Sequence, residues 1–298
     1  MTIKEFSGNM KQAVSLELGS GYKVEEVSVD KNNGVCLEAL LIKKNGLNLS
    51  PTIYLNSYYE DHLDGENIRE GAGRLVRDYK AALPSEGIDI SFFMDYGRVK
   101  ERLAFKLISS ELNTELLENI PHIPFLDLEI VFYYSVEMNG MEGGSILIRN
   151  SHMEHWGVGA EDLMRDSLEN APRILPGTCR DIFSMMKKMC PDKTSDVTDD
   201  LKELGLYVIS NERLTLGAAV MLYPGMLEEV SEMLGSSLYI IPSSIHELIV
   251  LSDNNGSDIK YLKDMIRAIN RTQVAPQDVL SDTLYRFDRD TGKITAAS

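Results

Sequence analysis

The chain has 298 residues and a formal net charge of −16 at pH 7, with 30 Lys and Arg against 46 Asp and Glu. A surface this acidic repels phosphate backbones and anionic lipids, so we expect neither ordinary nucleic-acid binding nor membrane association. The content of 43% apolar and 26% charged residues is typical of a globular protein, and no apolar run reaches the ~18 residues of a transmembrane helix.

The cysteines and the first residues bear on the cellular compartment. Cys36, Cys179 and Cys190 are odd in number, widely spaced and set in apolar or helical contexts, so we expect reduced thiols of the core type. The opening sequence MTIKEFSGNMKQ lacks the apolar region of a secretory signal. Both features predict a cytoplasmic protein.

Two amphipathic helices are predicted in the first third of the chain. Apolar residues recur at helical spacing over residues 2–18, and again over Glu66–Leu83, where Pro84 ends the pattern. Between the helices we expect three strands, at Tyr22–Val29, Val35–Ile42 and Leu47–Leu55.

Turn residues connect these strands into an antiparallel meander. Asn32-Asn33-Gly34 separates the first two strands, and Asn45-Gly46 suits the positive φ angles of a type I′ hairpin turn before the third. Pro51 cannot donate a backbone hydrogen bond, so the third strand is expected at a sheet edge or a bulge. The order of helix, three strands and helix predicts an α+β arrangement.

Residues 95–120 do not decide between strand and helix. Leu103–Ile108 fits either, and Asn113 fits the cap of a short helix. We interpret the polar stretch that ends in Pro121 and Pro124 as a boundary, which predicts two lobes over residues 1–120 and 121–298.

The second lobe begins with a long apolar run. Phe125–Val136 is rich in β-branched and aromatic residues, which predicts a central strand, and Ser145–Arg149 is expected to be its hairpin partner. Ser151 and Glu154 then fit a capping box, in which the serine caps a helix and the glutamate reaches back to a free amide.

Helices and strands alternate through the rest of the second lobe. Helices are expected over Glu161–Ala171, closed by Pro172, over Arg180–Cys190, and over residues 258–271, with a polar loop at 191–200. Residues 205–251 form the centre of the lobe. Their pattern predicts, in chain order, a strand, a second strand or short helix, an amphipathic helix and two further strands. Leu284–Phe287 and Ile294 flank a closing hairpin. Each lobe is thus predicted to be a mainly antiparallel sheet with helices packed on it.

The most prominent polar cluster is Pro242–Glu247, which we call the PSSIHE segment. Ser243, Ser244, His246 and Glu247 suggest a hydrolase. If a strand begins at Ser244, however, side-chain alternation sends His246 and Glu247 to opposite faces and leaves Ser244 ~7 Å from His246, too far for proton transfer. No Gly-x-Ser-x-Gly motif is present. We favour a turn whose serine hydroxyls bind backbone groups.

Two weaker groups of candidate residues remain. His152 and His155 are spaced to share a metal on a helix, but no further ligand is evident, and the capping box explains this stretch without a metal. Asn211, Glu212 and Arg213 follow an apolar strand, where ligands often bind in parallel sheets, although a turn with a surface ion pair suffices in an antiparallel one. The glycine pairs match no phosphate-binding motif, so no cofactor is expected.

Four segments carry a resemblance: Gly34–Tyr59, Asn150–Pro172, Leu206–Leu251 and Ile269–Phe287. They resemble an uncharacterised family of domains of unknown function that is common in Clostridia and their mobile elements, and are more remotely similar to the YtpQ-type family of Firmicutes. The PSSIHE segment with Gly217-Ala218-Ala219 is the most specific part. The resemblance implies a bacterial cytoplasmic protein and implies no catalytic residues.

Three hypotheses of function follow. The leading one is a cytoplasmic, non-enzymatic interaction or regulatory protein that binds another protein; a link to mobile elements or host defence is implied by the resemblance alone. The second is a hydrolase-like enzyme with a site around Ser243–Glu247 and Asn211–Arg213. The third is an acidic mimic of nucleic acid, which would gather its carboxylates on one face.

Overall fold

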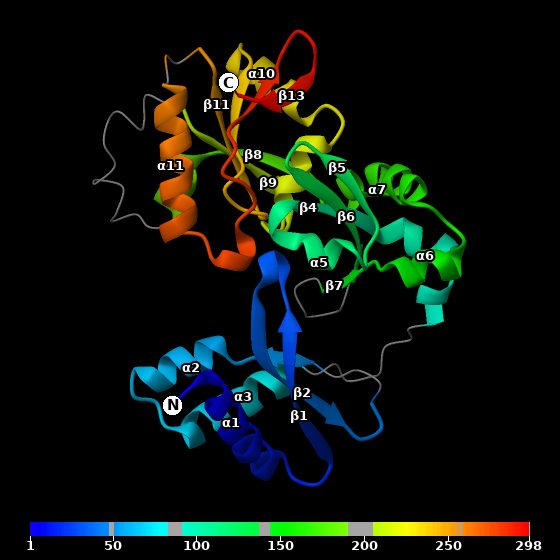
Figure 1. The fold of residues 1–298 in the computed structure, drawn as a ribbon, viewed down its shortest axis with the longest axis vertical. Coiled ribbons are helices and arrows are strands. Elements are labelled where there is room, and N and C mark those ends of the chain that lie inside the picture. The colour runs from blue at the N-terminus through cyan, green and yellow to red at the C-terminus, as the bar shows by residue number, and fades with distance from the viewer. Residues whose placement is uncertain are drawn as a thin grey trace. The chain divides into compact units, whose positions relative to one another are not determined.

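Figure 1 shows the fold in a computed structural model, which describes residues 1–47, 51–82, 91–136, 144–189, 205–254, 256 and 258–297. The chain forms two compact units, Met1–Phe92 (unit 1) and Phe93–Ser298 (unit 2). The helix stop predicted at Pro84, the thiol of Cys190 and the loop predicted at 191–200 lie outside the described residues. Within the described ranges, no helix is long and apolar enough to cross a membrane.

In its described residues, unit 1 is a three-stranded antiparallel sheet with three α-helices and a short 3-10 helix. Its elements are α1 (Ile3–Leu18), β1 (Tyr22–Asp30), η1 (Asn32–Gly34), β2 (Cys36–Lys44), β3 (Thr52–Tyr54), α2 (Asn56–Leu63) and α3 (Ile68–Ala82). The strand order is β1-β2-β3, so the strand that follows Pro51 is an edge strand, as predicted. Thr2 and Glu5 close a capping box at the start of α1, with hydrogen bonds of 3.3 and 2.8 Å.

The core of unit 1 forms where the apolar stripes of α1 and α3 meet one face of the sheet. Val24 of β1 pairs with Ile42 of β2, so both side chains point to the same face. They pack in one buried cluster with residues that come mostly from the helices: Phe6, Met10, Val14, Leu40, Leu55, Tyr58, Ala72, Leu75, Val76 and Tyr79. The two predicted helices and the first two strands are confirmed, whereas α2 was not predicted.

Unit 2 contains two antiparallel sheets. The 3-10 helix η2 (Ser91–Met94) crosses the boundary between the units. The first half of unit 2 then comprises α4 (Tyr96–Val99), η3 (Lys100–Arg102), β4 (Leu103–Ser109), η4 (Glu111–Asn113), α5 (Thr114–Leu117), β5 (His122–Phe125), β6 (Leu128–Ser135), β7 (Ser145–Leu147), α6 (Asn150–Trp156) and α7 (Ala160–Ile174). Its second half comprises β8 (Gly177–Asp181), α8 (Ile182–Met189), β9 (Tyr207–Asn211), η6 (Gly217–Leu222), α10 (Met226–Leu234), β10 (Leu238–Ile241), β11 (Leu248–Ser252), α11 (Ile259–Thr272), η7 (Pro276–Asp278), β12 (Tyr285–Asp288) and β13 (Lys293–Ala296).

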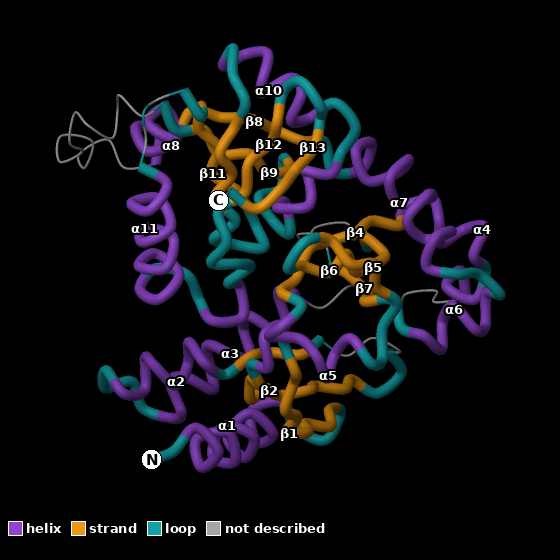
Figure 2. Tube along the Cα trace, turned by 45° about the horizontal axis from the view of Figure 1, so that its top comes forward, coloured by secondary structure: helices purple, strands orange, loops and turns teal. Residues whose placement is uncertain are grey.

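The two sheets of unit 2 are joined by the buried 3-10 helix η6. The smaller sheet has the order β4-β6-β5, with β7 paired to β6, and the larger has the order β13-β12-β10-β11-β9-β8. Five of the six residues of η6 are buried, and η6 contacts both β4 and β9. Helix α11 runs alongside the larger sheet (Figures 1 and 2), where Leu262 and Ile266 pack on Tyr239 and Leu251.

The α+β class with antiparallel sheets is confirmed, while the unit boundary differs from the one expected near residue 120. That residue falls between β4 and β6, which pair along their whole length from Leu103↔Tyr134 to Ser109↔Leu128. Two strands that share a hydrogen-bonded ladder fold as one body, so the chain from Phe93 onward belongs to unit 2. Unit 2 therefore has two sheets where one was expected.

Two predicted elements of unit 2 were wrong in their extent. The run from Phe125 is not one strand, because Leu126 adopts a positive φ of 56° and turns the chain from β5 into β6. The helix expected from Arg180 starts at Ile182, since residues 177–181 pair with β9 as the edge strand β8.

Two predictions about single residues were also wrong. Pro172 does not close its helix but lies inside α7, whose last turn continues to Ile174. Cys36 is not a core thiol, because its side chain is exposed, and Cys179 is only partly buried.

Asp127 links the two sheets of unit 2. It lies in the β5–β6 turn, and its carboxylate accepts hydrogen bonds from Ser281 (2.6 Å), Thr283 (3.0 Å) and Tyr285 (2.5 Å), which precede or begin β12. Burial and this carboxylate both raise the pKa of the Tyr285 hydroxyl, so the phenol stays protonated and donates. One turn of the smaller sheet is thereby fixed to an inner strand of the larger.

Replacing Asp127 with Asn should destabilise unit 2. An amide offers one acceptor oxygen in place of two, so hydroxyl donors lose partners, which costs about 2–3 kcal/mol in the free energy of unfolding. Denaturant unfolding would measure this, with Asp290→Asn in the exposed β12–β13 turn as control, expected within about 0.5 kcal/mol of wild type. Equal stability of the two variants would contradict a structural role for Asp127.

Candidate functional site

The PSSIHE segment connects β10 to β11 and is held on both sides by backbone hydrogen bonds. On one side, Ser244 forms an isolated antiparallel bridge with Val279, and Ile245 N–H donates to the carbonyl of Asp278 at 2.8 Å. On the other, the Gly217 N–H donates to the carbonyl of His246 at 2.9 Å. β11 begins only at Leu248, so the assumed strand start at Ser244 was wrong, and these bonds decide where the side chains lie.

The ring of His246 bridges two loops. Its Nδ1 lies 3.1 Å from the backbone nitrogen of Leu216, and its Nε2 lies 3.3 Å from Oδ1 of Asp278. A backbone N–H can only donate, so Nδ1 is the acceptor and Nε2 carries the hydrogen that faces Asp278. Both ring nitrogens are thus engaged in bonds that position the loops, and this tautomer offers no basic nitrogen to a serine.

The two serines are buried in the same turn. Ser244 Oγ accepts the N–H of His246 at 3.0 Å. Ser243 is 7% exposed, and its Oγ has no hydrogen-bond partner among the described residues. A nucleophilic serine needs a base within hydrogen-bonding reach and access to substrate. The structure brings the four candidate residues together, but as a turn.

Gly217 lies where three segments cross. A Cβ atom at this position would be 2.1 Å from Ser210 Oγ and 2.6 Å from both the Asn211 nitrogen and the His246 carbonyl oxygen. The Ser210 hydroxyl itself donates to the same carbonyl at 2.7 Å. Only glycine permits this close approach of η6 to β9 and the PSSIHE segment.

The loop before Gly217 holds the candidate residues Asn211, Glu212 and Arg213. Leu214 and Leu216 both have positive φ angles, of 53° and 55°, which strain an L-leucine. Asn211 is 1% exposed and restrains the loop: its Oδ1 accepts from the amides of Arg213 and Thr215, and its Nδ2 donates to the Thr215 carbonyl. Asn211 is therefore a structural residue, while Glu212 and Arg213 are exposed beside it.

His152 takes the role that the sequence suggested for Glu154. Helix α6 begins at Asn150, two residues earlier than the predicted capping box requires, and His152 Nδ1 accepts the N–H of Arg149 at 3.1 Å. The capping box of Ser151 and Glu154 was wrong for that reason. The His152 ring packs edge-on against Phe93, with 5.0 Å between ring centroids, and next to Trp156. Across the described ranges, no three His, Cys, Asp or Glu residues gather to hold a metal.

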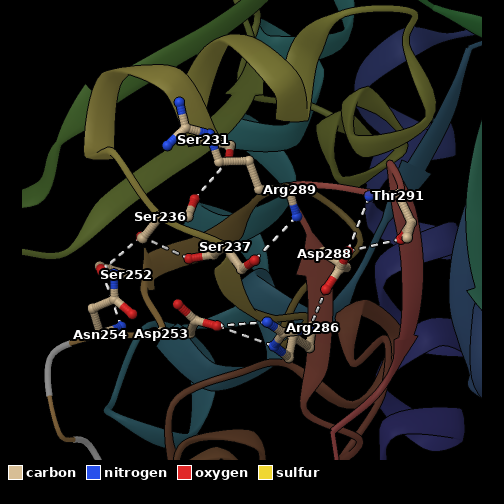
Figure 3. A network of polar contacts seen from close by, with 10 residues as sticks. All are labelled: Ser231, Ser236, Ser237, Ser252, Asp253, Asn254, Arg286, Asp288, Arg289 and Thr291. Carbon is tan, nitrogen blue, oxygen red and sulfur yellow. Dashed lines mark hydrogen bonds and ion pairs between the residues drawn. The ribbon is translucent and has the colours of Figure 1, made fainter.

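Figure 3 shows a polar network at one end of the larger sheet, which single-residue patterns did not reveal. Arg286 donates through Nε and Nη2 to Asp253 and through Nη1 to Asp288, at 2.8 to 3.0 Å. Hydrogen bonds from Arg286 and Thr291 lower the pKa of Asp288 to about 2. The arginine charge is thus balanced by two carboxylates, which leaves a poor site for phosphate.

A concavity lies in unit 1, between α1 and α3. It has a volume of about 900 Å³. It is lined by Ala13, Leu16, Glu17, Glu66, Arg69, Glu70, Ala72, Gly73 and Arg77, and we call it the α1–α3 groove. Leu16 is 86% exposed there, the highest value for a large apolar side chain in the described ranges. The exposure of Leu16 could have been predicted from the sequence, because Leu16 lies outside the row of apolar residues that α1 buries.

Replacing Gly217 with Ala should destabilise unit 2 severely. The added methyl group meets backbone atoms that cannot move independently, so we expect a loss of about 3 kcal/mol or more and a fall in melting temperature of roughly 6–12 °C. Gly144→Ala is the matched control, because its Cβ would make only an ordinary 3.7 Å contact with Val136. Similar melting temperatures for the two variants would contradict the close approach.

Glu247 should make stability depend on pH. Burial raises its pKa above the usual value, so its contribution is fully present below the unfolded pKa of roughly 4.3 and is lost as pH rises through the higher folded pKa. Glu247→Gln removes this loss. The variant should melt above wild type at pH 7, and the gap should close toward pH 4. Glu212→Gln serves as the exposed control, and a gap that widens in acid would contradict the argument.

The comparisons with known proteins give a family without an activity. No curated protein and no solved structure matches the chain significantly. A model of a family of unknown function, DUF5688, matches residues 3–289, which includes both units and the PSSIHE segment. The chain therefore belongs to the family of unknown function DUF5688.

Proposed function

We propose that this protein is a non-enzymatic interaction protein that binds a protein partner through the α1–α3 groove. The observation that carries the proposal is Leu16, a large apolar side chain 86% exposed at the edge of a groove of about 900 Å³. Water around such a side chain is released when a partner covers it, which favours association. The charged residues at the groove would add orientation.

The hydrogen bonds of the PSSIHE segment support the non-enzymatic part of the proposal. His246 holds the strained Leu216 and faces Asp278, so its geometry serves the fold. Removing His246 should therefore lower stability, with no activity to lose. A hydrolase-like site at Ser243–Glu247 is the competing hypothesis.

The setting of the protein is inferred more broadly. A bacterial cytoplasmic protein, tied to mobile elements or to defence, is what the resemblance to the clostridial family implies. We propose it on that ground alone.

The proposal is tested by affinity capture with matched baits. Wild type, Leu16→Glu and Leu63→Glu would each be immobilised and exposed to an extract of the source cells. Leu63 is 63% exposed on α2 of the same unit and outside the groove lining, so it controls for the new charge. We expect at least one protein, this chain included, that wild type and Leu63→Glu retain and Leu16→Glu loses by tenfold or more.

A second measurement addresses catalysis. Wild type would be assayed on panels of esters, peptides and nucleotides, beside Ser244→Ala and His246→Gln variants that are checked for folding. Turnover by wild type that a folded variant loses would overturn the proposal in favour of the hydrolase. Retention profiles unaffected by Leu16→Glu would overturn the role of the groove.

A further inference from the structure

We propose that the partner at the α1–α3 groove is a second copy of the same chain, related to the first by a twofold axis. This inference rests on the proposed function and names the occupant of the same surface. It begins with the floor of the groove, where Ala13, Ala72 and Gly73 leave room beside the protruding Leu16. A protruding leucine next to small residues is self-complementary, because a twofold axis places each leucine over the small residues of the other copy.

The charges of the groove support the same occupant. Five charged residues line it: Glu17, Glu66, Arg69, Glu70 and Arg77. Glu66 is already paired with Arg74 at 2.8 Å within unit 1. The other four comprise two acids and two bases, so the groove is locally balanced in a chain of net charge −16. A basic partner would meet the arginines, and an acidic one the glutamates.

Gly73 lies between one of the acids and one of the bases of the groove. A Cβ on Gly73 would lie 3.6 Å from Nη1 of Arg77 and 3.7 Å from the carboxylate oxygens of Glu17, so an acid and a base flank the smallest residue of the groove. Arg69, Gly73 and Arg77 follow each other at intervals of four on α3, which keeps them in one row along the helix. Rotation by 180° about an axis near Gly73 brings the acid of one copy opposite the base of the other.

The size of the groove sets the strength of association. Helix α1 has 16 residues. At 1.5 Å per residue it is about 24 Å long, and two helices side by side span about 20 Å, which gives ~500 Å² per copy. Stable interfaces bury ~800 Å² per partner, so this one is small and belongs with the weak, transient contacts, for which we expect a dissociation constant in the micromolar range or weaker. The dimer is therefore a concentration-dependent state.

Sedimentation equilibrium of the full chain from ~1 to ~300 μM tests the inference, because this range brackets the expected dissociation constant. We expect the apparent mass to rise from 33.4 kDa toward twice that value. Leu16→Glu should raise the dissociation constant at least tenfold, and Leu63→Glu should leave it within twofold. Circular dichroism would confirm that each variant is folded.

Charge reversal supplies an independent test. Glu17→Arg and Arg77→Glu, taken singly, place like charges opposite one another and should each weaken the dimer at least fivefold. The double variant restores opposite charges and should recover most of the association, and unchanged melting temperatures of the single variants in dilute solution would show that their weaker association does not come from damage to unit 1.

The outcomes separate this inference from the function on which it rests. A constant mass of 33.4 kDa, or a dimer insensitive to Leu16→Glu, overturns the second copy as partner. If Leu16→Glu still abolishes capture of a different protein, the groove remains an interaction surface. If neither association depends on Leu16, both proposals fall.

Discussion

The architecture of unit 2 depends on the close approach at Gly217. At this point η6 passes against β9 and the PSSIHE segment, at distances that exclude even a methyl group. The approach lets the amides of Gly217 and Ala218 reach the carbonyls of His246 and Ile245. η6 is thereby attached to the larger sheet while its buried residues also contact β4 of the smaller one. Together with the Asp127 turn, it fixes two sheets into one body.

This attachment explains why polar residues gather in an apolar neighbourhood. Leu214 and Leu216 adopt left-handed conformations that each cost roughly 1–3 kcal/mol. Asn211 contributes three hydrogen bonds to the same loop and His246 one more, each worth about 1 kcal/mol net. The energy of the backbone strain and the energy of the hydrogen bonds are of similar size. The net stabilisation of this region therefore comes from the burial of η6. The serine, histidine and asparagine side chains here form hydrogen bonds with the backbone. They are not placed to act as a nucleophile or a base.

The elements that could be predicted from the sequence are those whose pattern lies within a short stretch of the chain. Amphipathic spacing gave α1, α3 and α11, and alternating apolar residues with turn signals gave β1, β2 and the closing hairpin of β12 and β13. The turn at Leu126 was missed because a leucine with a positive φ leaves no glycine or asparagine to mark it. β8 was missed because its residues, Gly-Thr-Cys-Arg-Asp, do not alternate in polarity at an edge that is half solvated.

The sequence indicated which residues make up the candidate site, but it did not indicate which residues they would bind. The PSSIHE segment was visible as a polar cluster between apolar strands, and the expectation that its serine hydroxyls bind backbone groups holds for Ser244 but not for Ser243, whose Oγ has no partner among the described residues. The partners of His246 lie 30 and 32 positions away, at Leu216 and Asp278, and no pattern within the segment indicates them. The assumed strand start at Ser244 failed because pairing with Val279 is a single bridge and not a ladder. Long-range hydrogen bonds therefore decided what the local pattern left open.

The acidity of the chain bears on which surfaces can meet another protein. Three arginines, Arg74, Arg165 and Arg286, each contact two carboxylates, so these three positive charges are balanced within the units. With a net charge of −16, the chain as a whole repels another acidic protein. At physiological ionic strength, charges more than about 8 Å apart are largely screened, so the charges within a contact outweigh the total. The α1–α3 groove has acids and bases in equal number once Glu66 is paired, which limits the local repulsion between the two copies that we propose to meet there.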